Sequence, residues 1–276
     1  TYKEDIRKAM YDYFKKPTLE TDLTEIYPVL SEIKFTKRHL KSWMKLQKVD
    51  TPLALLGASS YIKYEPKGVC LIISPWNFPI NLTLVPLVSA IAAGNTVIIK
   101  PSEMTPNASK LMAKIIKDLF TEDEVALIDG EVEVAQELLK LPINHIFFTG
   151  SPSVGKIEME AASKHLTSVT LELGGKSPTI IDDSANLEKA VKKIIFVKFT
   201  NAGQTCIAPD YVFLKENLKE EFPTLFRENL NEFYSDSTEN SNSYVRIVNQ
   251  KHFKQCSTYL EEESNDITQV AIGGNF

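Results

Sequence analysis

Cysteine and histidine are scarce in this chain. Its 276 residues include only three cysteines and four histidines, scattered along the sequence: Cys70, Cys206, Cys256, His39, His145, His165 and His252. Cysteines so few and so far apart exclude a disulfide framework and a thiolate metal site. The histidines lack the spacing of metal ligands, so core or surface roles are expected for them and no metal site is predicted.

Long apolar runs and dense blocks of basic residues are also missing. The apolar stretches VCLIIS and LVPLVSAIAA fall short of the roughly 20 residues that cross a bilayer, and Pro86 interrupts the second. The N-terminal TYKEDIRKAMYDYF is charged and amphipathic, with no secretory apolar region. The 31 basic and 36 acidic residues give a net charge of -5, which argues against nucleic acid as a partner. A cytoplasmic protein is therefore expected.

The composition that remains is globular, with 43% hydrophobic and 24% charged residues. Helical spacing of apolar residues over the first fifty positions predicts two or three surface helices. Residues 52–67 contain Gly57, Pro66 and a short apolar–polar alternation, which favour a hairpin or edge strand. From residue 68, short apolar runs alternate with helical stretches. Strands are expected at 68–74, 96–100, 124–129, 145–150 and 168–173, and helices at 82–93, 107–120, 131–140 and 153–164.

Near-continuous apolar strands separated by helices indicate an α/β fold built on a doubly wound parallel sheet. Ligands of such sheets bind beyond the C-terminal ends of the strands, where SPWNFP, KPSE, TGS and GGKSP lie in this chain. A second α/β unit is expected after Pro178, with the strand PTIIDD, a helix over 186–199 and then the loop of Cys206. We therefore expect a first domain at 1–174 and a second at 175–276.

The segment GSPSVGKI at residues 150–157 fits the phosphate-binding pattern G-x-x-x-x-G-K between a strand and a helix. Ile157 stands where a P-loop has Ser or Thr, so the hydroxyl that would hold magnesium is missing and nucleoside triphosphate hydrolysis is disfavoured. A helix that starts near Ser153 still offers backbone N–H groups to a phosphate. The dinucleotide fingerprint G-x-G-x-x-G is absent, so a dinucleotide would have to bind in another way.

Three residues together are compatible with covalent acyl chemistry. Cys206 lies in the polar stretch NAGQTCIAPDYV, Glu172 ends the apolar run VTLEL, and Asn77 lies in PWNFP at another strand end. They could act as a nucleophile, a general base with a pKa raised by burial, and an oxyanion donor. Alternatively, Cys206 is a structural thiol, Glu172 is a neighbour of a helix N-cap and Asn77 is a turn residue. Lys100 and Glu103 could equally be solvated loop charges.

Five motifs in order and spacing carry a resemblance to a known family: GVCLIISPWNFP, AGNTVIIKPSE, HIFFTGSPSVGK, VTLELGGKSP and NAGQTCIAPDYV. The chain resembles the NAD(P)-dependent aldehyde dehydrogenases, and most of all their class 3, fatty-aldehyde-type branch. The resemblance implies that Cys206 is the nucleophile and that Glu172 activates the deacylating water. It also implies that Asn77 and the backbone N–H of Cys206 stabilise the oxyanion. The reaction implied is oxidation of an aldehyde to a carboxylic acid through a thiohemiacetal and a thioester.

The resemblance also implies a cofactor site for NAD, with NADP possible. Lys100 and Glu103 would hold the adenine ribose, Gly150 and Ser151 the pyrophosphate, and the backbone of Leu173 and Gly174 would lie beside the nicotinamide. The complete set of expected cofactor-binding residues is Ser74, Pro75, Trp76, Lys100, Glu103, Gly150, Ser151, Gly155, Leu173 and Gly174. The carboxylate of Glu103 would repel a 2'-phosphate, which favours NAD.

Members of this family are considerably longer than 276 residues, so the chain is expected to be truncated. The resemblance implies a dinucleotide-binding domain at 1–174 and an incomplete catalytic domain at 175–276. Two alternatives therefore stand beside the dehydrogenase hypothesis: an inactive dinucleotide-binding fragment, and a relative that passes the acyl group to coenzyme A. Glu172 argues against the second alternative, because such relatives lack an efficient water-activating base. The full-length protein is expected to act on a small-molecule aldehyde, of medium or long aliphatic or aromatic type, as a homodimer, with the hairpin near 52–67 available to bridge subunits.

Overall fold

The computed structural model describes residues 2–234, 238 and 241–261. These residues fall into two compact units, one containing residues 23–172 and the other residues 1–22 together with 173–276. The sequence-based division placed residues 1–174 together, whereas in the structure the first 22 residues pack with the C-terminal part of the chain. The assignment of cofactor binding to one domain and catalysis to the other stays a prediction.

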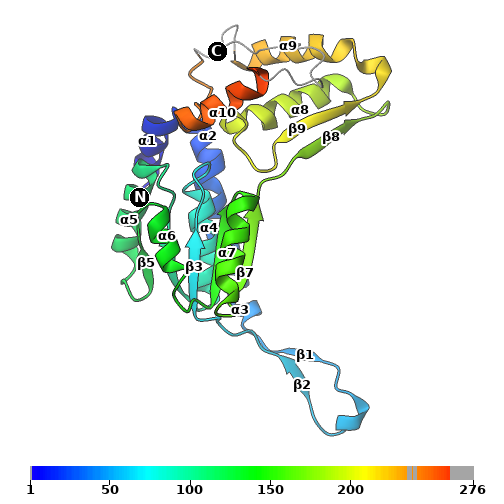
Figure 1. The fold of residues 1–276 in the computed structure, drawn as a ribbon. Helices are drawn as coiled ribbons and strands as arrows, with labels where there is room; N and C mark the ends of the chain where they lie inside the picture. The colour runs from blue at the N-terminus through cyan, green and yellow to red at the C-terminus, as the bar shows by residue number, and fades with distance from the viewer. Residues whose placement is uncertain (1, 235–237, 239–240, 262–276) are drawn as a thin grey trace. The chain divides into compact units, whose positions relative to one another are not determined.

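A five-stranded sheet forms the centre of the first unit (Figure 1). Its strand order is β5-β4-β3-β6-β7, and the pairs β3–β4, β3–β6 and β4–β5 are parallel. The strands are β3 (Val69–Ile73), β4 (Thr96–Lys100), β5 (Val125–Leu127), β6 (His145–Gly150) and β7 (Ser168–Leu173). All five expected strands are present, and the predicted α/β doubly wound sheet is confirmed.

Four helices connect these strands, as the periodicity predicted: α4 (Asn81–Ala92), α5 (Pro106–Leu119), α6 (Val132–Leu138) and α7 (Pro152–Ser163). Leu87 of α4 and Ile116 of α5 pack into one core cluster with Ile72, Val97 and Ile99 of the sheet. Gly94 has a φ of 83°, a left-handed conformation that glycine adopts without strain, and it ends α4 just before β4. The order of the strands reverses between β3 and β6, which makes their C-terminal ends the switch point where ligands of such sheets bind.

A short antiparallel hairpin extends away from the sheet (Figure 1). Its strands β1 (Gln47–Val49) and β2 (Ser60–Ile62) flank a 3₁₀ turn, η2 (Leu53–Leu55). The expected hairpin is present, but it begins at residue 47, not 52, since the 52–59 segment forms its tip. Leu53 and Leu56 at this tip are 84% and 88% exposed, which is unusual for leucine.

The N-terminal helices are α1 (Lys3–Phe14), α2 (Thr18–Thr21), a π-helical turn η1 (Asp22–Ile26) and α3 (Tyr27–Trp43). The expectation of two or three helices here is confirmed. Met10 and Phe14 of α1 are fully buried, however, so this helix contributes to a core in addition to covering a surface. Among the described residues, none of the helices is long and apolar enough to cross a membrane.

The second unit contains a two-stranded parallel sheet, β8 (Ser177–Ile181) with β9 (Pro209–Leu214). Helix α8 (Leu187–Phe199) packs on it, and the side chain of Asn186 caps this helix by accepting from the N–H of Lys189 at 2.9 Å. Strand β8 and helix α8 were predicted. The remaining elements were not: η3 (Thr200–Gly203), β9, η4 (Glu216–Leu218), α9 (Glu221–Tyr234) and α10 (Gln250–Glu261).

Candidate functional site

The structure brings several predicted cofactor residues to one edge of the five-stranded sheet, the edge formed by the carboxyl ends of its strands. Ser74 follows β3 directly, and its backbone N–H donates to the carbonyl of Lys100, the last residue of β4, at 3.0 Å. Gly150 ends β6 on the other side of β3, and Leu173 ends β7 next to β6. These residues therefore lie at the carboxyl ends of neighbouring strands around the switch point, as predicted.

Two features of this edge fit a bound dinucleotide. The hydroxyl oxygen of Ser74 is buried and has no hydrogen-bond partner in the described part of the chain, although a buried hydroxyl normally has one. A Cβ atom on Gly150 would lie 2.5 Å from Cζ of Phe148, so this position has room for backbone alone. A polar group of a bound dinucleotide could hydrogen-bond the hydroxyl of Ser74 while the phosphates of the dinucleotide approach the backbone at Gly150.

Lys100 and Glu103 form an ion pair beside this edge. Lys100 is 3% exposed, and its Nζ lies 2.7 Å from Oε2 of Glu103, whose side chain is about one third exposed. Burial alone would raise the pKa of Glu103, but the hydrogen bond from Lys100, a backbone hydrogen bond and the lysine charge together lower it. The pair therefore presents a carboxylate and an ammonium group side by side, and these groups could hydrogen-bond two ribose hydroxyls. The alternative reading of Lys100 as a solvated loop charge was wrong.

Helix α7 begins immediately after Gly150. Ser151 is its N-cap, and the hydroxyl of Ser151 accepts from the N–H of Val154 at 3.3 Å and bonds the hydroxyl of Ser153 at 2.9 Å. Pro152 occupies the first turn, where its missing N–H is of no consequence. Gly155, one turn in, is buried. The helix thus directs its positive end toward the same strand edge, which accounts for the P-loop-like sequence.

Asn77 lies in the turn between β3 and α4. Pro75 is buried, and Trp76 and Asn77 are partly buried. The start of α4 is held by Glu25, a fully buried residue whose Oε2 accepts from the N–H groups of Ile80 at 3.1 Å and Asn81 at 3.0 Å. A carboxylate at this end of a helix satisfies two orphan donors and complements the dipole. The turn that carries Asn77 is therefore anchored at its downstream end.

Glu172 lies one residue before the end of β7, followed by Gly174 and Gly175. The expectation that this carboxylate is buried was wrong, because Glu172 is exposed in the structure. Strand β7 lies at the end of the sheet, and its other residues are only partly buried. Gly174 is also exposed, and a Cβ there would meet no atom within 4 Å.

Cys206 lies in the second unit, in the loop between η3 and β9. Its thiol is exposed, as expected for a reactive cysteine, whereas Cys70 is buried in the sheet core. Gly175 approaches this loop, since a Cβ at Gly175 would lie 3.9 Å from the backbone carbonyl oxygen of Cys206. Asn77 and Glu172 belong to the other unit, so the assembly of the three residues into one site remains part of the proposal below.

Sequence reasoning missed three glutamates with structural roles. Glu25 caps α4, as described above, and Glu20 contacts the loop of Cys206. Glu158 of α7 is 3% exposed, and its Oε2 has no hydrogen-bond partner among the described residues, so burial raises its pKa to about 7. Glu158 is detectable in the sequence, because Gly155, Glu158 and Ala162 share the buried helix face. Glu20 and Glu25 have no such signal, since their partners are distant in the chain.

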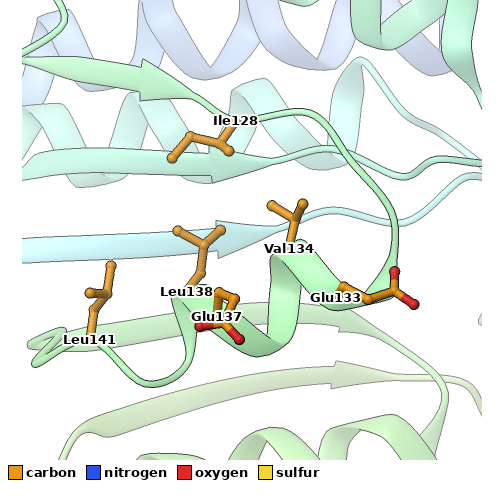
Figure 2. Close-up of a pocket in the computed structure, with 6 residues that line it drawn as sticks. All are labelled: Ile128, Glu133, Val134, Glu137, Leu138 and Leu141. Carbon is orange, nitrogen blue, oxygen red and sulfur yellow. The ribbon is translucent and has the colours of Figure 1, made fainter.

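A small apolar hollow lies beside α6 (Figure 2). It has a volume of about 320 Å³ and is lined by Ile128, Glu133, Val134, Glu137, Leu138 and Leu141. Figure 2 shows the aliphatic side chains turned toward the hollow. None of the predicted catalytic or cofactor residues lines it.

Known proteins with similar sequences are aldehyde dehydrogenases. The 4,4'-diaponeurosporen-aldehyde dehydrogenase of Staphylococcus aureus is 46% identical over 267 residues, which cover 97% of this chain and 58% of that protein. Aldehyde dehydrogenase family 3 member A2 of Macaca fascicularis is 42% identical, with 98% of this chain and 55% of that protein covered. The chain thus spans little more than half the length of these relatives, which include class 3 members.

Solved structures agree with the sequence comparisons. The substrate-bound state of Staphylococcus aureus AldH superposes with a TM-score of 0.91 at 46% identity, covering 94% of this chain and 57% of that one. An NADP-dependent enzyme of E. coli superposes with a TM-score of 0.89 at 26% identity, covering 99% and 56%. The profile described as "Aldehyde dehydrogenase family" matches residues 2–276. This chain belongs to the aldehyde dehydrogenase family.

Proposed function

We propose that the protein to which this chain belongs oxidises an aldehyde to a carboxylic acid, with a nicotinamide dinucleotide as the hydride acceptor. The observation that carries the proposal is the exposed thiol of Cys206, in a loop approached by the Gly-Gly segment that follows Glu172. Only two residues lie between Glu172 and Gly175, so the chain keeps their Cα atoms within about 10 Å of each other. Deacylation by water requires a base, and Glu172 is the residue proposed for that role.

In the proposed mechanism the Cys206 thiolate attacks the aldehyde carbon, forming a carbon–sulfur bond and an oxyanion. The amide of Asn77 and the backbone N–H of Cys206 donate hydrogen bonds to that oxygen. A bound nicotinamide dinucleotide would supply the acceptor for the hydride of this thiohemiacetal. The remaining thioester is hydrolysed by water, whose proton passes to Glu172. One aldehyde, one water and one oxidised cofactor thus give one acid, one reduced cofactor and one proton.

The cofactor residues are proposed by the same reasoning. Lys100 and Glu103 would bind the adenine ribose, Ser74, Gly150 and the first turn of α7 would face the phosphates, and Leu173 and Gly174 would lie beside the nicotinamide. Pro75 and Trp76 would line the approach. Glu103 favours NAD over NADP, since a carboxylate attracts a ribose hydroxyl and repels a phosphate. A medium-chain aldehyde is the substrate class to test first, and a cytoplasmic homodimer is the proposed state of the whole protein.

The test is production of reduced nicotinamide by the purified 276-residue chain with NAD or NADP and a medium-chain aldehyde. Steady production that disappears in Cys206→Ser supports the proposal. Cys256→Ser is the matched control, because Cys256 is also an exposed cysteine but lies in α10. If the Cys256 variant stopped producing reduced nicotinamide, or if the Cys206 variant continued to produce it, the role of Cys206 would be contradicted.

A second candidate is that this chain alone is a dinucleotide-binding fragment that does not turn over. It is favoured by apolar side chains on β8 and β9 that are unusually open to solvent: Ile180 is 75% exposed and Phe213 58%. Cofactor binding measured by titration calorimetry, without production of reduced nicotinamide, would support this candidate.

A further inference from the structure

The loop that leads to Cys206 contains backbone conformations that need outside support. Asn201 and Ala202 have φ values of 54° and 53°, and Gly203 follows with a φ of 74°. Residues other than glycine rarely adopt this left-handed region, and they keep it only where their surroundings hold them there. Two such residues in succession, directly after helix α8, imply that contacts from elsewhere in this unit set the path of the loop.

Glu20 of helix α2 supplies one such contact. Its Oε1 accepts from the backbone N–H of Asn201 at 2.8 Å, although the two residues are 181 positions apart in the chain. Asn201 is fully buried, so water cannot replace this acceptor. A hydrogen bond from a buried N–H to a carboxylate is stronger than one between neutral groups, and its removal leaves the donor unsatisfied.

An aromatic cluster lies near Glu20. Phe199, Tyr234 and Tyr244 form an aromatic cluster at the end of α8, with ring centroids 5.4–6.0 Å apart. Burial, followed by the charge of Glu20 and the neighbouring Tyr244, raises the pKa of Tyr234 to about 12. The carboxylate of Glu20 therefore lies close enough to this cluster to act on Tyr234, and the cluster packs where the same loop begins.

Gln204 extends the support toward the cysteine. Its Nε2 donates to the carbonyl oxygens of Asn201 at 2.8 Å and Arg246 at 3.2 Å, and its Oε1 accepts from the N–H of Val248 at 2.9 Å. Gln204 is only two residues before Cys206. The loop is thus tied at Asn201 by Glu20 and at Gln204 by the segment around residue 246.

We propose that Glu20 is a positioning residue for Cys206: by holding the N–H of Asn201 it fixes the left-handed turn that directs the thiol and the backbone N–H of Cys206. The inference rests on the proposed function, in which Cys206 is the nucleophile. Glu20 does not touch the reacting atoms in this proposal. It acts through the backbone at Asn201 and through Gln204.

The experiment compares Glu20→Ala, Glu20→Gln and Glu20→Asp in the 276-residue chain, with Glu228→Ala as the matched control. Glu228 is an exposed glutamate of α9 in the same unit. Glu20→Ala is expected to lower kcat about ten- to a hundredfold, because a small misplacement of a reacting group has effects of this size. The Kd for NAD should change less than twofold. Glu20→Gln keeps an oxygen acceptor and should restore most of kcat.

Hydrogen exchange of the peptide that covers residues 200–208 is the second measurement, and it requires no activity. Exchange there should be at least tenfold faster in Glu20→Ala than in the unaltered chain, while peptides of α5 and α7 should exchange unchanged. If Glu20→Ala does not fold, Glu20→Asp gives the same comparison, since it keeps the charge and shortens the side chain by one methylene.

Unchanged kcat and unchanged exchange in Glu20→Ala would overturn the proposal, and so would a Glu20→Gln variant as impaired as Glu20→Ala. If the unaltered chain produces no reduced nicotinamide, the exchange result decides alone. Faster exchange confined to 200–208 would then support the role of Glu20 while the proposed function fails for this chain. Unchanged exchange would reject that role.

Discussion

The carboxylate of Glu25 accepts the backbone N–H of Asn81 at 3.0 Å and closes the N-terminus of α4 from 56 positions away. The same oxygen accepts from Ile80, and Glu25 is fully buried. Because Asn77 lies in the turn just before this helix, the contact links a buried acid to the position of the proposed oxyanion donor.

Glu25→Ala is expected to lower the free energy of unfolding by about 2–3 kcal/mol, since the buried N–H of Ile80 and the partly buried N–H of Asn81 lose their acceptor. Urea denaturation measures the change. Glu160→Ala, which alters an exposed glutamate of α7, is the control and should change stability by less than about 0.5 kcal/mol. Equal effects of the two substitutions would contradict the capping role of Glu25.

Glu158 should make stability depend on pH. Its folded pKa of about 7 lies above the ordinary value of 4.5, so the folded state holds a proton that the unfolded state releases. The stability linked to this proton is present below pH 4.5 and is lost as pH rises to about 7. Glu158→Gln removes the titration and should be more stable than the unaltered chain at pH 8, by roughly 2 kcal/mol. Parallel pH profiles of the two chains would contradict this.

Glu103→Gln should weaken NAD binding about fivefold while leaving NADP binding unchanged or improved. The substitution removes the charge that would attract the ribose hydroxyl and repel a 2'-phosphate, and it loosens the pair with Lys100. Calorimetric titration with each cofactor measures the ratio. Glu122→Gln, at an exposed position before β5, is the control. An unchanged ratio of affinities would reject a ribose-binding role for Glu103.

Glu172→Gln should separate acylation from deacylation. Cys206 can still form the thioester, so one burst of reduced nicotinamide should remain, while steady turnover falls by about a hundredfold or more because no base activates water. Stopped-flow absorbance distinguishes the two phases. Unaltered turnover would reject the role of Glu172, and addition of coenzyme A reveals whether the acyl group can leave by another route.

The local pattern of apolar residues determined the sheet. Strands such as VCLII and TVIIK are apolar on both faces, because a parallel sheet covered by helices buries both faces. Their short length and the lack of a helical repeat of apolar residues distinguish them from the helices that connect them. The same argument located the strand ends, and with them Ser74, Lys100 and Gly150. The exposure of Cys206 was also correct, since a polar loop cannot bury a thiol in an apolar core.

Contacts between residues far apart in the chain were decided by the tertiary structure alone. The carboxylates of Glu20 and Glu25 contact backbone N–H groups 181 and about 55 positions away, and no spacing rule encodes such pairs. Packing of the first 22 residues with the C-terminal unit is of the same kind. The exposure of Glu172 also depended on the edge position of β7, because strand order is set by how helices pack the strands together and not by the strand sequence itself.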